Sequence, residues 1–103
     1  MAPRTTSPAF EKAYKKATYL QNASNDDMLD LYAYAVIAKA EKDLATTPKP
    51  GMFDLAGKAK RSKWEKYVNE GVTPADAEKA YVAKVDELVS KHGLKDTVPA
   101  ELK

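Results

Sequence analysis

The sequence contains no cysteine and only one histidine, His92. The lack of cysteine excludes disulfide bonds, thiolate zinc sites and cysteine nucleophiles. A lone histidine at the end of a predicted helix suits the helix dipole, but it has no partner for a catalytic relay. There is also no glycine-rich phosphate loop and no metal-ligand spacing. We therefore predict that the protein is not an enzyme and that it holds no metal and no cofactor.

Long hydrophobic runs and an excess of one charge are missing as well. No stretch approaches the ~20 apolar residues of a membrane span, and residues 1–8 lack the apolar segment of a secretory signal. Seventeen basic against fifteen acidic side chains leave a net charge of +2, so no global field recruits nucleic acid and any anion site must be local. We expect a soluble, cytoplasmic monomer with no integral membrane segment.

Helical periodicity and capping residues occur together in four segments. The predicted helices are 8–22 after Ser7-Pro8, a second after Ser24 that runs to Ala40, 55–69 after Asp54, and one from Pro74, capped by Thr73, to Gly93. The second helix is apolar nearly all round, which predicts neighbours on more than one side. No segment competes as a strand, so the fold class is all-α, a four-helix bundle.

The bundle has one long connection, between the second and third helices, where Pro50-Gly51 fits the centre of a type II turn. With 103 residues the chain forms a single domain. We assign residues 1–7 to a flexible N-terminal tail, 8–93 to the domain, and 94–103 to a C-terminal tail that packs through Leu94.

The third helix gathers basic residues in its first turns, namely Lys58, Lys60, Arg61 and Lys63. The helix dipole is already positive there, so the arrangement is unfavourable unless an anion binds. Lys60 and Trp64 are four residues apart and share a helix face, which places a positive end beside an aromatic surface. The alternatives are a solvated basic face, with the six tyrosines as half-buried bundle residues, or a site for a phosphate, an aromatic base and an apolar chain.

Four stretches in order resemble the acyl-CoA-binding protein family, from Phe10 to Gly93. They are "DDMLDLYAY", "KPGMFDLAGKAK", the position of Trp64, and "TPADAEKAYVAKVDEL". The resemblance implies a four-helix bundle of that type, which binds long-chain fatty acyl-CoA esters and carries them without chemistry.

The resemblance also implies a set of site residues. The CoA head would be held at Tyr32, at the positions of Ala35 and Val36, and by Lys60 and Tyr81, while Phe10, Met28 and Leu29 would contribute to an acyl groove. An alignment that places Tyr34 on the family's first tyrosine is the alternative, but "SNDDMLDLY" matches as a block and favours Tyr32.

The main departure from the family lies at Ala35-Val36, where the family has a tyrosine and a lysine. An uncompensated loss of a hydrogen bond to a charged group would weaken binding by about ten- to a hundredfold. Two residues offer compensation: Lys39, two turns beyond Tyr32 on the same face, and Arg61, beside Lys60, which could form a bidentate phosphate contact.

Two rival functions follow from the same residues. A helical module that has lost its ligand and mediates protein interactions would explain "AVIA", the sequence of residues 35–38. A nucleic-acid-binding domain would use the basic run, but the modest net charge disfavours it.

Overall fold

The computed structural model describes residues 5–40, 44 and 46–102, and these form an all-α fold. Its helices are α1 (Pro8–Ala17), α2 (Asn25–Lys39), α3 (Leu55–Asn69), α4 (Pro74–His92) and the short 3₁₀ helix η1 (Ala100–Leu102). Extended pairing within the described ranges is limited to one bridge between Leu20 and Leu94. The predicted fold class is confirmed. None of the described helices combines the length and apolar character that crossing a bilayer requires.

Side-chain caps begin each of the four α-helices, as the sequence predicts. The Ser7 hydroxyl accepts from the Phe10 amide at 3.2 Å in α1. Ser24 and Thr73 open α2 and α4 with reciprocal capping boxes. The Asp54 carboxylate accepts from the Gly57 amide at 2.9 Å, so α3 begins where it was predicted to begin.

The first helix is shorter than the predicted 8–22 and ends at Ala17. The Thr18 hydroxyl donates to the Lys15 carbonyl at 2.8 Å, and the next two amides bond three residues back instead of four. Asn22 then adopts a positive φ of 55°. The periodic Leu20 is buried all the same, because this segment pairs with the chain that leaves α4.

The predicted type II turn at Pro50-Gly51 is wrong. Such a turn needs a positive φ at the glycine, and among the described glycines only Gly71 and Gly93 have one. The turn lies two residues further on: the Asp54 amide donates to the Gly51 carbonyl at 3.1 Å, and Met52 and Phe53 are the central residues.

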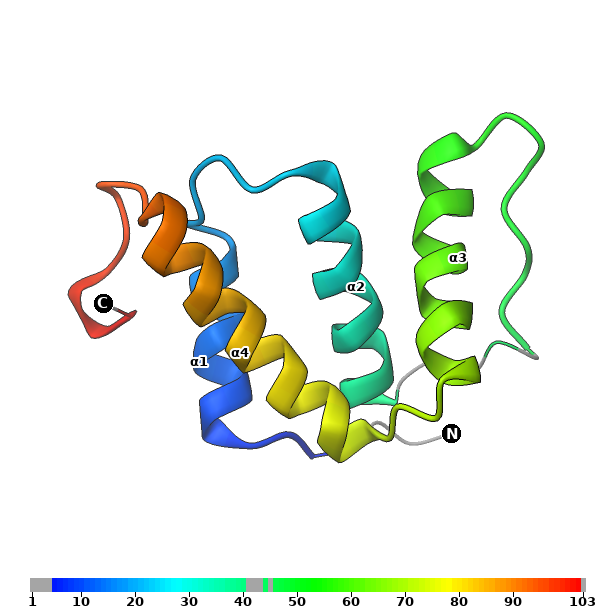
Figure 1. Ribbon diagram of the computed structural model, residues 1–103, viewed down its shortest axis with the longest axis horizontal. Helices are drawn as coiled ribbons and strands as arrows, with labels where there is room; N and C mark the ends of the chain where they lie inside the picture. Colours follow the sequence, from blue (N-terminus) through cyan, green and yellow to red (C-terminus); the bar gives the residue numbers. More distant parts are fainter. Residues whose placement is uncertain (1–4, 41–43, 45, 103) are drawn as a thin grey trace.

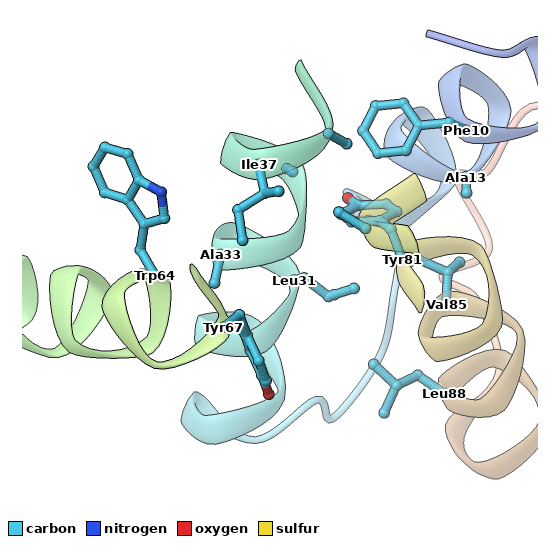
Figure 2. Packing of buried hydrophobic residues seen from close by; sticks show 14 of the residues in the cluster. Phe10, Ala13, Leu31, Ala33, Ile37, Trp64, Tyr67, Tyr81, Val85 and Leu88 are labelled. Atoms are coloured by element: carbon cyan, nitrogen blue, oxygen red, sulfur yellow. The ribbon is translucent and has the colours of Figure 1, made fainter. Parts of the chain in front are cut away.

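Helix α2 occupies the centre of the molecule, with α3 on one side and α4 on the other, while α1 packs against α4 (Figure 1). This confirms that α2 has neighbours on two sides. Figure 2 shows Ala33 and Ile37 toward Trp64 and Tyr67 of α3. Leu31 lies on the other side, toward the residues of α1 and α4. The fully buried side chains of that second layer include Phe10, Val85 and Leu88.

The C-terminal segment packs more extensively than its low apolar content predicts. Val98 and Leu102 are both buried, and η1 contacts α1. Leu94 forms the expected anchor through its bridge with Leu20. The segment after α4 therefore covers the outer side of α1.

Carboxylates at the start of α2 form ion pairs with both neighbouring helices. Asp27 pairs with Lys84 of α4 at 2.8 Å, while Asp26 and Asp30 pair with Lys63 of α3 at 2.9 and 3.1 Å. The hydrogen bond from Lys84, with further bonds from Ser24, lowers the pKa of Asp27 to about 2, and the hydrogen bond to Asp27 raises the pKa of Lys84. These pairs join three helices at one end of α2.

We predict that an Asp27→Asn variant is less stable by roughly 1 kcal/mol at neutral pH. The pKa of Asp27 is about 2 in the folded chain and near 3.9 in an unfolded one, so the stabilisation is present above pH ~4 and disappears as the pH falls toward 2. Urea unfolding at several pH values measures this. The control is Asp76→Asn, which alters the same position of the α4 capping box without a lysine partner in the described chain. A difference between the parent and Asp27→Asn that persists unchanged at pH 2 would contradict the prediction.

Candidate functional site

An apolar groove of about 350 Å³ lies among all four helices. The spacing of its lining residues along α1 and α2 follows one face of each helix, at intervals of three and four residues. Residues that line the groove are Tyr14, Ala17, Thr18, Met28, Leu31, Tyr32, Ala35, Lys60 and Tyr81. An elongated apolar group could bury itself here, because carbon atoms form most of the wall.

Two aromatic rings, Tyr14 and Tyr81, line the groove on the side of α1 and α4, and a third, Phe10, packs behind them. The Phe10 and Tyr81 ring centroids are 5.0 Å apart, and Tyr14 stacks on Tyr81 at 6.0 Å. Phe10 is fully buried behind these rings, so it supports the wall and does not line the groove. Burial, with a smaller contribution from Tyr14, raises the pKa of Tyr81 well above its usual value, and its hydroxyl therefore stays protonated.

A second cavity of about 210 Å³ lies between α3 and the loop that precedes it. Its lining comprises Tyr32, Thr47, Pro48, Pro50, Asp54, Gly57, Lys60, Arg61 and Trp64. Tyr32 and Lys60 line both cavities, and the Lys60 ammonium lies 5.3 Å from the Tyr32 ring centroid. The two cavities are therefore adjacent and share one aromatic ring and one cation.

The basic residues of α3 differ in what their charged groups contact. Lys58 donates to the Met52 carbonyl at 2.7 Å, and Lys63 pairs with aspartates of α2. No carboxylate of the described residues lies within ion-pair distance of Lys60. The unfavourable basic run is thus largely satisfied within the protein, whereas Lys60, without an acidic partner among the described residues, lines both cavities.

Arg61 is held by the loop that leads into α3. Its guanidinium donates to the Leu44 and Thr47 carbonyls at 2.9 and 3.1 Å, and to the Glu65 carboxylate at 3.0 Å. All three nitrogens therefore have partners within the chain. The side chain fixes the loop against α3 and at the same time adds positive charge to the second cavity.

Lys39 lies beside the groove at the end of α2. Its ammonium is 3.7 Å from the Tyr14 ring centroid, which is a close cation–π contact. Because Tyr14 lines the groove, this places a second positive charge next to it, on the α1 side, whereas Lys60 comes from α3.

The structure thus brings most of the predicted residues together. Tyr32, Ala35, Lys60, Tyr81 and Met28 line the groove, and Arg61 lines the second cavity. Leu29 and Val36 are half-buried and lie outside the walls of both cavities.

Sequence reasoning assigned no site role to Tyr14, Ala17, Thr18 and Leu31, which line the groove. Tyr14 follows Phe10 by four residues, and Ala17 and Thr18 follow at the next helical intervals, so a helical projection of α1 would have found the face. The partners of Arg61 could not be predicted in this way, because they are backbone carbonyls of a loop, and the pattern of side chains does not indicate where such carbonyls point.

Apolar walls, two cations and tyrosine hydroxyls suit a ligand with an apolar body and an anionic head. A hydroxyl and an ammonium can donate to phosphate oxygens, and exposed ring faces can stack on a planar base. In the described part of the chain, no three or more acidic or histidine side chains are arranged so that they could hold a metal ion.

Comparison with known proteins gives a consistent result over most of the chain. The family model described as "Acyl CoA binding protein" matches residues 7–85. The chain is 47% identical over 76 residues to "Acyl-CoA-binding protein homolog 1" of Caenorhabditis elegans, which covers 74% of this chain and 84% of the relative. It is 36% identical over 91 residues to "Acyl-CoA-binding protein" of Saccharomyces cerevisiae, and this match covers 84% of this chain and 95% of the yeast protein.

A solved structure gives the same result for the fold. The crystal structure of Oryza sativa Acyl-CoA-Binding Protein 2 matches with a TM-score of 0.70 and 32% sequence identity. The match covers 81% of this chain and 87% of the rice chain. The order of helices described above is therefore that of a known architecture.

We predict that Arg61→Leu loosens the loop before α3 without unfolding the bundle. The substitution removes the donors to Leu44 and Thr47, whereas α3 keeps its packing through Trp64 and Tyr67. The amides of Thr46, Thr47 and Lys49 should then exchange with deuterium at least about tenfold faster, because a charged hydrogen bond contributes roughly 1.5–3 kcal/mol. Glu65→Gln is the matched control, since it affects the same guanidinium but leaves both loop carbonyls bonded. Equal exchange in Arg61→Leu and the parent would show that Arg61 does not hold the loop.

Proposed function

Because the chain belongs to the acyl-CoA-binding protein family, a family of acyl-CoA-binding proteins that are not enzymes, we propose that it binds long-chain fatty acyl-CoA esters and serves as their intracellular carrier and buffer pool. The observation that carries this proposal is the shared position of Tyr32 and Lys60 between the apolar groove and the second cavity, which Arg61 also lines. An amphipathic ligand can bury its chain in the first while its phosphates reach Lys60.

The acyl chain supplies most of the affinity in this mechanism. Each buried methylene contributes about 0.8 kcal/mol, which is close to a fourfold gain in affinity. Met28 and Leu31 lie on the α2 side of the groove, and Leu29, half-buried on the same helix, is a neighbouring acyl contact in our proposal. Affinity should rise with chain length until the groove is filled.

The nucleotide head is selected by the cations and tyrosines. We assign phosphate binding to Lys60, hydrogen bonding to Tyr32 and Tyr81, and the positive charge that Val36 cannot supply to Lys39. Lys39 is favoured over Arg61 for this last role, because all three guanidinium nitrogens of Arg61 have partners in the loop and α3. Arg61 acts as a positioning residue for the second cavity. The positions of Ala35 and Val36 border the head group without donating to it.

A ligand-free module that mediates protein interactions is the alternative, and the site disfavours it. Lys60 lies beside two cavities and has no carboxylate partner among the described residues. A bound phosphate explains this arrangement, whereas a protein without a ligand does not. The groove among Tyr14, Tyr32 and Tyr81 is present as well.

We predict one-to-one binding of palmitoyl-CoA in a calorimetric titration, with free CoA and palmitate binding at least about a thousandfold more weakly. Free CoA buries no chain in the groove, so it lacks the acyl contribution to the free energy of binding. Palmitate satisfies none of the head-group donors, so it lacks the head-group contribution. Equal affinity for palmitate and palmitoyl-CoA would contradict the assignment of the head-group site. Absence of binding by a protein that circular dichroism shows to be helical would reject the function itself.

We predict that Lys60→Met weakens palmitoyl-CoA binding by about ten- to a hundredfold, because one charge-assisted contact to phosphate is lost. Lys66→Met is the matched control: it removes the same charge from the same helix, but Lys66 lies over the Tyr67 ring and lines neither cavity. Calorimetry of both variants measures the difference. If the two substitutions have equal effects, the contribution of Lys60 is general electrostatics and not a specific contact.

We predict that Lys39→Met lowers the affinity for palmitoyl-CoA by about tenfold. The variant should also show a reduced preference for CoA esters over dephospho-CoA esters, which lack the 3′-phosphate. The reason is that Lys39 provides the cation missing at Val36. Lys12→Met, an exposed lysine of α1 outside both cavity walls, is the control. An unchanged preference in Lys39→Met would transfer this role to another residue.

A further inference from the structure

The loop that enters α3 exposes a cluster of large apolar side chains. Met52, Phe53 and Leu55 are 75%, 91% and 75% exposed, and the other exposed large apolar residues of the described chain do not exceed 46%. We call these three residues the loop tip. It lies at the start of α3 (Figure 1). Contiguous apolar groups of this size on a soluble protein generally mark a contact surface.

The backbone of the loop tip is held in place although its side chains extend into solvent. Lys58 donates to the Met52 carbonyl at 2.7 Å, and the Asp54 amide donates to the Gly51 carbonyl at 3.1 Å. Asp54 also caps α3 through the Gly57 amide. The apolar side chains are therefore presented outward by fixed backbone, which lowers the entropy cost of inserting them into another phase.

Positive charge surrounds the loop tip. Residues 49–60 contain Lys49, Lys58 and Lys60 against the single carboxylate of Asp54, and that carboxylate accepts from the helix amide. Lys49 and Lys58 are both exposed. The protein as a whole carries a net charge of only +2, so this excess is a local feature of the tip.

We propose that the loop tip docks on the surface of an anionic lipid bilayer, with Phe53 and its neighbours inserted at the interface and Lys49 and Lys58 at the level of the lipid phosphates. Protruding aromatic and aliphatic groups beside lysines are the pattern of interfacial membrane binding. A protein partner fits less well, because protein interfaces are depleted in lysine.

This docking goes beyond the binding of acyl-CoA and does not require it. Pro50, Asp54 and Gly57, which flank the tip, also line the second cavity, so a docked molecule would hold that cavity close to the lipid surface. The tip residues Met52, Phe53 and Leu55 line neither cavity, so they can be substituted without altering the walls of the site.

The test measures co-sedimentation of the ligand-free protein with sucrose-loaded vesicles of phosphatidylcholine, with and without a quarter of phosphatidylserine. We expect binding to the anionic vesicles that decreases with salt, and much weaker binding to the neutral ones. Phe53→Ser should lower the partition coefficient at least about tenfold, because a buried phenyl ring is lost. Lys49→Gln should lower it about fivefold.

Matched controls separate insertion from a general loss of apolar or basic residues. Val68→Ser removes an apolar side chain that is 42% exposed elsewhere on α3, and Lys79→Gln removes an exposed lysine of α4, and both should bind vesicles as the parent does. Equal partition of Phe53→Ser and the parent, or equal binding to neutral and anionic vesicles, would overturn the proposal. Concentration-dependent dimers abolished by Phe53→Ser, with no vesicle binding, would assign the tip to a protein contact instead.

Discussion

The attachment of α3 to α2 is the constraint on which the rest of the site depends. Helix α3 carries Lys60, yet its main packing partner among the helices is α2 alone. Two kinds of contact hold it there. Trp64 and Tyr67 bury themselves against α2, with Tyr67 stacked on Tyr34 at 4.5 Å. Asp30 accepts from the Tyr67 hydroxyl at 2.6 Å and from Lys63 at 3.1 Å, which fixes the register of the two helices.

Asp30 is costly to bury and is therefore surrounded by donors. Besides Tyr67 and Lys63, the Lys84 ammonium of α4 lies 3.9 Å away. A carboxylate in such a position stabilises the fold only while its donors remain, since an unpaired buried charge is strongly destabilising. Desolvation of the phenol, followed by its hydrogen bond to Asp30, raises the pKa of Tyr67 above its usual value, so this donor keeps its proton at physiological pH.

The sequence was sufficient for the parts of this structure that depend on local chemistry. Caps such as Asp54 and Thr73 could be identified because each acts within three residues of itself. The end of α1 and the turn after Gly51 were placed wrongly, because pairing with the segment after α4 and the bond to Lys58 decided them. The resemblance pointed to Lys60 and Tyr32, which line both cavities. The contacts of Arg61 could not be predicted, because they are made to backbone carbonyls of a loop that is distant in sequence.

The replacement of the family's Tyr-Lys pair by Ala35 and Val36 has a counterpart elsewhere in the groove. Ala35 is small and lines the groove, and Tyr14 of α1 supplies an aromatic ring to the same groove. One turn beyond Val36, Lys39 supplies an ammonium and places it 3.7 Å from that ring. Under the proposed function, Tyr14 of α1 provides the aromatic surface that the family has on α2. Lys39 provides the positive charge from a position one turn further along α2. The two changes fit together, because the cation–π contact orients Lys39 toward the groove.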